Sequence, residues 1–181
     1  LLVCLVLISV VSYPVAADIQ FSSFKHAKLA AVYTTSSGEK GVLTDLYVYA
    51  TEGSGHVFVD TQPFTQIDMQ GSARLAALVA CDVLNLNPND YDFFYVVRVN
   101  SPVVGGPSGG ASMTVATIAS LLNLSMRDDV VMTGMINPDG SVGPVGGIPA
   151  KLRAAASEGV KTFLIPEAVS YTHLRAHETR H

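Results

Sequence analysis

Residues 93–122 read FFYVVRVNSPVVGGPSGGASMTVATIASLL, and this stretch decides the fold class. It opens with a nearly continuous apolar run at Phe93–Val99, which predicts a strand buried on both faces. A turn rich in glycine follows at Pro102–Gly110, and the apolar spacing beyond it predicts a helix over Gly109–Leu122. The inward face of this helix is expected to consist of Ala111, Val115, Ile118, Ala119 and Leu122.

Strands and helices continue on both sides of this stretch. Further helices are expected from Asp68 to about Leu84 and from Pro149 to Gly159. The segment Glu52-Gly53-Ser54-Gly55 predicts a hairpin between the strands on either side of it. The expected strands are Leu29–Thr35, Val42–Ala50, His56–Asp60, Asp129–Ile136 and Val160–Ile165. The fold class is therefore α+β (or α/β), in one domain without internal repeats.

The composition excludes several classes of protein. The chain has 181 residues, of which 49% are hydrophobic and 14% charged, and its mean hydropathy is +0.36. These values exclude a disordered tail and a charged coiled coil. The 11 Lys and Arg residues are dispersed and the net charge is −4, so no nucleic-acid partner is expected. No GxxxxGK[ST] or GxGxxG motif occurs, so a bound nucleotide is not expected. We expect no cofactor.

The two ends of the chain differ from the middle. The apolar run Leu1–Val11 and the small residues before Asp18 predict a signal peptide, residues 1–17, cut after Ala17. An uncleaved membrane tether is the alternative, although Pro14 interrupts the run. Either reading places the folded domain, residues 18–169, outside the cytoplasm, secreted or membrane-anchored. Cys81, left as the single cysteine, is expected to be a small core residue.

Residues 170–181 break with the pattern that precedes them. The segment has no core pattern and holds three of the five histidines. We interpret it as an artefactual tail and expect the native sequence to be incomplete at both ends. A metal site built from these histidines is the alternative.

Ser108 is the candidate nucleophile. It lies between a glycine-rich turn and the start of a helix, where free backbone N–H groups near Ser108 and Gly109 are placed to hold an oxyanion. The alternative is that Ser108 only caps the helix. Outside the tail the histidines are His26 and His56, which we expect at the surface, so a histidine base has little support.

Lys151 is the candidate general base. Its neighbours are almost all apolar or small, and it falls in the first turn of a predicted helix. Both an apolar environment and the helix dipole lower the pKa of an ammonium group, which a lysine base requires. The alternative is a surface lysine whose stem covers apolar neighbours. Lys161, at a helix-to-strand junction, is expected to be exposed.

Two of these segments together resemble the proteolytic domain of Lon proteases. The Gly-Pro-Ser-[Ala/Gly]-Gly motif of that family is matched at residues 106–110, and its Gly-Gly-[hydrophobe]-x-x-Lys motif at residues 146–151. The separation of Ser108 and Lys151 also agrees with the family. Between them, residues 129–134 match a family strand whose threonine, Thr133 here, contacts the lysine. The resemblance covers about residues 40–167.

The resemblance implies both a fold and an activity. The fold would be a single Lon proteolytic-type domain of the ribosomal-protein-domain-like superfold. The activity would be that of an ATP-independent serine endopeptidase acting on unfolded or flexible polypeptides. Ser108 and Lys151 would form the catalytic dyad, supported by Thr133, Gly106, Pro107, Gly109 and Gly110. Family members form hexameric rings, so a homo-oligomer is an expectation. The chain looks most similar to stand-alone, exported Lon-like proteins of archaea.

Two departures from the family pattern keep other functions open. Gly105 stands where many members carry an acidic residue, and Met135 stands where cytoplasmic relatives often have Glu. These departures favour the alternative of a catalytically weak scaffold or peptide-binding protein. A self-processing protease is a third possibility.

Overall fold

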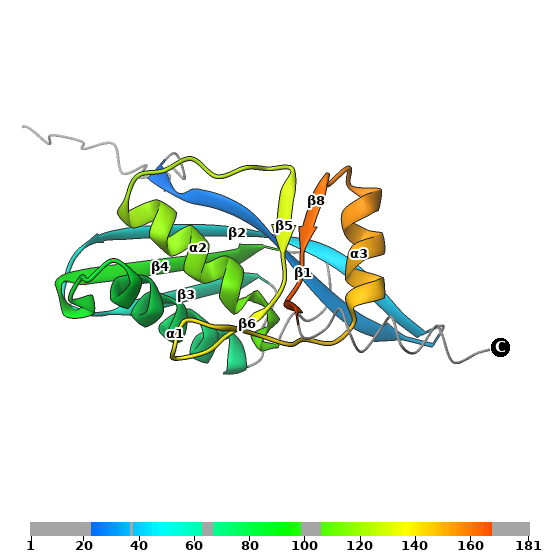
Figure 1. Cartoon of the computed structure of the whole chain (residues 1–181), viewed down its shortest axis with the longest axis horizontal. Helices are drawn as coiled ribbons and strands as arrows, with labels where there is room; N and C mark the ends of the chain where they lie inside the picture. The colour runs from blue at the N-terminus through cyan, green and yellow to red at the C-terminus, as the bar shows by residue number, and fades with distance from the viewer. Residues whose placement is uncertain (1–22, 37, 63–66, 99–105, 168–181) are drawn as a thin grey trace, which may run out of the picture.

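The computed structural model describes residues 23–36, 38–62, 67–98 and 106–167 (Figure 1). Its centre is a six-stranded mixed sheet in the order β3-β4-β2-β1-β5-β8, and a separate two-stranded pair joins β6 and β7. The strands are β1 Lys25–Thr35, β2 Gly38–Glu52, β3 Val57–Gln62, β4 Tyr91–Arg98, β5 Val130–Met132, β6 Met135–Ile136, β7 Val142–Gly143 and β8 Thr162–Leu164. This arrangement confirms a mixed α/β single domain.

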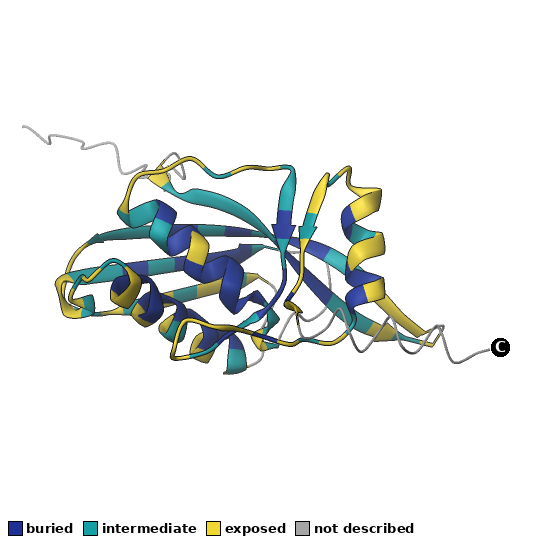
Figure 2. Ribbon diagram, in the orientation of Figure 1, coloured by how far each residue is buried: buried dark blue, intermediate teal, exposed yellow. Residues whose placement is uncertain are grey.

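Helices cover both faces of the sheet (Figure 1). The helices α1 (Ile67–Val83) and α2 (Gly110–Leu121) pack on one face over the main core, which includes Leu46 and Val48 of β2 and the buried Cys81. The helix α3 (Ile148–Ser157) packs over a second core that contains Leu43 of β2. Because successive strand residues point to opposite faces, α3 lies on the face opposite α1 and α2. Figure 2 shows the buried residues concentrated between these layers.

The predicted hairpin between the second and third strands is wrong. β3 does not pair with β2; it pairs in parallel with β4, which lies between them and pairs antiparallel with β2. The segment after β2 is held by the start of β4 instead, since the Gly55 N–H donates to the Tyr91 carbonyl at 3.0 Å. The hairpin that does form joins β1 to β2.

The predicted inward face of α2 is only partly correct. Ala111 and Ala119 are buried, but Val115 is 42% exposed and Leu122 is 50% exposed. The buried side of the helix instead includes Met113 and Ala116. The face of α2 that packs on the sheet is therefore rotated about the helix axis from the predicted face. Val115 lies outside the packed face and remains exposed to solvent.

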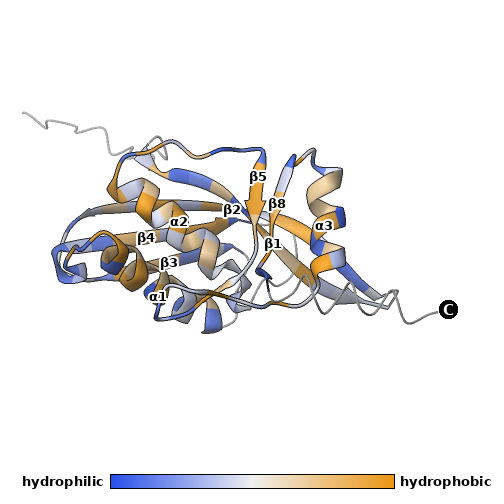
Figure 3. Cartoon of the chain, in the orientation of Figure 1, coloured by the Kyte–Doolittle hydropathy of each residue, from blue (hydrophilic) through white to orange (hydrophobic). Residues whose placement is uncertain are grey.

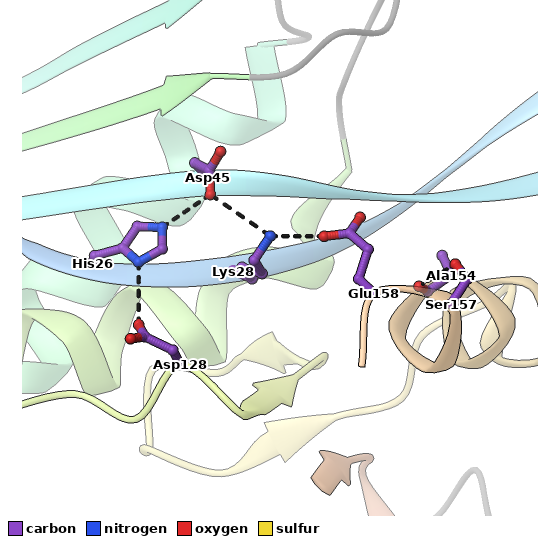
Figure 4. Close-up of polar contacts among 7 residues, drawn as sticks. All are labelled: His26, Lys28, Asp45, Asp128, Ala154, Ser157 and Glu158. Atoms are coloured by element: carbon purple, nitrogen blue, oxygen red, sulfur yellow. Dashed lines mark hydrogen bonds and ion pairs between the residues drawn. The ribbon is translucent and has the colours of Figure 1, made fainter. Parts of the chain in front are cut away.

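A polar cluster ties β1 to segments on both sides of it (Figure 4). The His26 ring lies between Asp45 of β2, at 2.9 Å, and Asp128, which precedes β5, at 3.4 Å. Lys28 Nζ donates to Glu158 at the end of α3 at 2.7 Å, and this contact raises the pKa of Lys28. The cluster fixes β1 between β2 and β5. In the described ranges, no helix is long and apolar enough to cross a membrane; residues 1–22 lie outside them.

Candidate active site

Ser108 lies in a 3₁₀ turn, η3 (Pro107–Gly109), that leads directly into α2. The N-cap residue of η3 is Gly106, with φ of 100°, and the N-cap residue of α2 is Gly109. Neither residue makes a side-chain capping hydrogen bond. Ser108 is half-buried and does not cap the helix, so that alternative is wrong. A Cβ on Gly110 would lie 2.8 Å from Ile136 Cγ2, so only glycine lets the start of α2 approach β6 this closely.

Thr133 and Gly134 connect β5 to the serine turn. The single strand predicted over residues 129–136 is interrupted here, because the backbone bonds to two other segments. The Thr133 N–H donates to the Leu164 carbonyl at 3.0 Å, and the Gly134 N–H donates to the Ser108 carbonyl at 2.8 Å. The Thr133 hydroxyl also donates to the Ser108 carbonyl, at 3.3 Å. The backbone of Ser108 is thereby held against the end of β5.

Lys151 is buried in the first turn of α3. Its side chain is 2% exposed, so the alternative of a surface lysine is wrong. The helix begins after Gly147, whose φ of 68° is left-handed and whose added Cβ would lie 2.7 Å from Val32 Cγ1. Glycine at this position therefore sets where the helix starts and how closely it packs on β1.

Thr133 links Lys151 to the serine turn through two hydrogen bonds. Lys151 Nζ donates to Thr133 Oγ1 at 3.1 Å. Because the Thr133 hydroxyl donates its hydrogen bond to the Ser108 carbonyl, the hydroxyl oxygen is the acceptor for the Lys151 amine. A neutral Lys151 can donate one N–H in this way and keep its lone pair available. One hydroxyl thus bridges the two sequence motifs.

Burial sets the charge state of Lys151. Desolvation lowers its pKa from 10.5 to about 8, and the Glu39 carboxylate opposes this shift. Among the described residues no carboxylate forms an ion pair with the amine, so the neutral form becomes populated as the pH approaches 8. Sequence reasoning missed Glu39, because it lies between two predicted strands and only the β1–β2 hairpin brings it toward α3. No local signal identifies such a contact.

The remaining candidate residues lie elsewhere. His56 is 63% exposed, and His26 belongs to the polar cluster on β1. Met135 lies half-buried in β6, Lys161 is 78% exposed, and Gly105 lies outside the described residues. The described part of the chain holds no group of three or more His, Cys, Asp or Glu that could bind a metal ion. Residues 170–181, with their histidines, also lie outside it.

Comparison with known proteins gives a consistent result. A family model described as the Lon protease (S16) C-terminal proteolytic domain matches residues 35–174, which include both motifs. Lon protease 1 of Herpetosiphon aurantiacus is 31% identical over 144 residues, 70% of this chain and 18% of that protein. Lon protease of Escherichia coli K12 is 38% identical over 104 residues, 54% of this chain and 13% of that protein. The chain thus spans less than a fifth of the length of these curated relatives.

Proposed function

Because the chain belongs to the family of Lon protease (S16) C-terminal proteolytic domains, we propose that it is a serine endopeptidase with Ser108 as nucleophile and Lys151 as general base. The observation that carries this proposal is the buried Lys151 amine, whose pKa is lowered to about 8 and which is hydrogen-bonded to Thr133 beside the serine turn. Among the described residues, no other lysine is buried in this way.

The chemistry needs only these side chains and water. Neutral Lys151 takes the hydroxyl proton of Ser108 as its oxygen attacks the peptide carbonyl. The resulting ammonium then protonates the leaving amine, which breaks the C–N bond and leaves an ester on Ser108. Water, deprotonated by Lys151, hydrolyses the ester and restores the serine. Thr133 is a positioning residue that orients the amine through the 3.1 Å hydrogen bond.

Backbone N–H groups near Ser108 would hold the negative oxygen of the tetrahedral intermediate. The N–H of Gly110 donates to the Pro107 carbonyl, and that of Ala111 donates to the Gly134 carbonyl. These two groups are therefore occupied, and we assign the oxyanion to the N–H groups of Ser108 and Gly109. Gly106 and Pro107 shape the turn that presents them.

The proposal also covers the ATP requirement, the state of the substrate, the location and the oligomeric state of the protein. None of the chemical steps consumes a nucleotide, so we propose that peptide hydrolysis proceeds without ATP and is limited to unfolded or flexible polypeptides. The apolar run at Leu1–Val11 supports a location outside the cytoplasm, secreted or membrane-tethered. Family membership supports assembly into a homo-oligomer.

The test is hydrolysis of an unfolded protein by the full chain without ATP. Ser108→Ala and Lys151→Ala should each lose activity by several orders of magnitude. The exposed Ser157→Ala and Lys161→Ala are the matched controls and should leave it unchanged. Equal activity of Ser108→Ala and the wild type would overturn the proposal. A folded wild type that cleaves nothing would favour a scaffold protein, and a mass change absent in Ser108→Ala would identify self-processing.

A further inference from the structure

Four aromatic side chains form a row across the face of the sheet opposite α1 and α2. The ring centroids of Phe24 and Tyr49, on β2, lie 5.3 Å apart. Phe94 of β4 continues the row, with its ring 6.2 Å from Tyr49 and 4.8 Å from Phe58 of β3. The register of the sheet explains these contacts, because Phe94 lies directly opposite both Tyr49 and Phe58. We call these four residues the aromatic row.

The aromatic row lies on the side of the sheet away from the main core. Neighbouring strand residues point to opposite faces, so Phe94 points away from the core that Phe93 and Tyr95 enter. In Figure 1 α1 and α2 lie in front of β2, β3 and β4, which puts the row on the far side. Figure 3 shows β4 among the hydrophobic segments of the sheet, and this strand supplies apolar side chains to both faces.

The row is only partly covered by the described part of the chain. Of the described helices, α3 lies on the same side of the sheet, and it packs on β1 and β2. Phe58 is 48% exposed, and the other three residues of the row are half-buried. A chain of aromatic rings thus borders solvent over β3 and β4.

The charged groups around the row are paired within the protein. The Arg98 guanidinium of β4 donates a hydrogen bond to the Asp60 carboxylate of β3. The Asp92 carboxylate accepts the N–H groups of Ser54 and His56 at 2.9 and 2.8 Å. The polar cluster of Figure 4 also contains side chains of both signs. The row is therefore surrounded by balanced charges and not by a patch of one sign, so its contacts would depend on the rings.

The chain enters the folded domain at one end of the row. Phe24 directly precedes β1, and the apolar run Leu1–Val11 lies upstream of it. The linker from Val11 to Phe24 spans at most about 45 Å even when fully extended. A membrane tether in residues 1–17 would hold the row within this distance of the bilayer, where even a weak affinity for lipid is sufficient for contact. Aromatic rings favour the boundary between lipid and water.

We propose that, in the chain that keeps residues 1–17, the aromatic row rests on the surface of the lipid bilayer. The proposal goes beyond the peptidase function, because it assigns the orientation of the domain on a membrane. The serine turn lies on the other side of the sheet, where Gly109 packs against the core residue Leu29. In this orientation Ser108 is directed away from the lipid, toward polypeptides in solution.

Phe58→Trp provides the test, because the chain contains no tryptophan and the new indole is the only one. Leu78→Trp is the matched control, since Leu78 is 52% exposed on α1, on the other side of the sheet. Each full chain, with residues 1–17, is mixed with phosphatidylcholine vesicles whose acyl chains are brominated, and quenching of the indole fluorescence is measured. Circular dichroism checks that both variants are folded.

Quenching should be several-fold stronger at position 58 than at position 78, and high salt should not reduce it, because the contact is not ionic. Equal quenching at the two positions, quenching at neither, or a chain that does not bind the vesicles would overturn the proposal. A blue shift at position 58 that grows with protein concentration without vesicles would assign the row to a contact between two copies, and would also overturn it. Hydrolysis by Ser108 and Lys151 is tested separately and stands or fails on its own.

Discussion

Replacing Lys151 with methionine should abolish catalysis and stabilise the fold near neutral pH. Methionine is unbranched and of similar length, so the space around residue 151 stays filled while the charge is removed. In the wild type, burial lowers the pKa of Lys151 from 10.5 to about 8. Since one pKa unit corresponds to about 1.4 kcal/mol, the protonated amine destabilises the folded state by about 3 kcal/mol at about pH 7.

The pH dependence of this penalty has a definite sign. Between about pH 8 and 10.5 the unfolded chain holds the Lys151 proton and the folded chain has released it, so the stability of the wild type rises with pH. Below about pH 8 both states are protonated and the penalty is constant. The penalty should therefore fall from about 3 kcal/mol at about pH 7 to about 1 kcal/mol at about pH 9.5.

Urea unfolding of the wild type and Lys151→Met at these two pH values measures the effect. The lost hydrogen bond to Thr133 subtracts about 1 kcal/mol from the gain at both pH values, so the change of about 2 kcal/mol between them is the decisive quantity. Lys161→Met, at a 78% exposed position, is the control and should show no such change. If the difference in unfolding free energy between the two proteins did not change with pH, the conclusion that burial destabilises the charged Lys151 amine would be refuted. Wild-type kcat/KM should rise with a midpoint near pH 8.

Three further predictions concern the surroundings of the amine and the start of α3. Thr133→Val should lower kcat by about tenfold or more with KM unchanged, because the amine loses its acceptor, whereas Thr133→Ser should retain most of the activity; equal loss in both variants would argue against a positioning role. Glu39→Gln should move the pH–rate midpoint to lower pH, since the carboxylate raises the pKa of Lys151; an unmoved midpoint would contradict this. Gly147→Ala should destabilise the fold by about 1–3 kcal/mol in thermal melts, because of its positive φ and the contact with Val32. Val32→Ala in the same chain should recover part of the loss.

Local patterns predicted the positions of the helices and most strands. The helix expected over Asp68–Leu84 forms at Ile67–Val83, and that expected from Pro149 ends at Ser157, close to Gly159. Capping signals and apolar spacing act over a few residues, so they are visible in the sequence. Strand pairing is not local. β4 follows β3 by a whole helix and still takes the place beside β2, which no turn signal could indicate.

The candidate site was predicted unevenly for the same reason. Ser108 and Lys151 stood out because each lies in a distinctive short motif, and the burial of Lys151 agrees with its apolar neighbours. The contact between Thr133 and the amine was an implication of the family resemblance, since nothing local to Thr133 indicates it. The exposure of Val115 depends on how α2 packs on the sheet, and periodicity alone gave the wrong face.

The position of β1 between β2 and β5 has a consequence for the order in which the protein is made. β1 and β2 are consecutive, so their hairpin can form as soon as both strands leave the ribosome, while the other edge of β1 stays open until β5 is synthesised. Lys151 follows later still, on α3. Ser108 and Lys151 can therefore come together only after β1, β2, α2, β5 and α3 have all been synthesised. The proposed dyad is incomplete in a growing chain until α3 has been made.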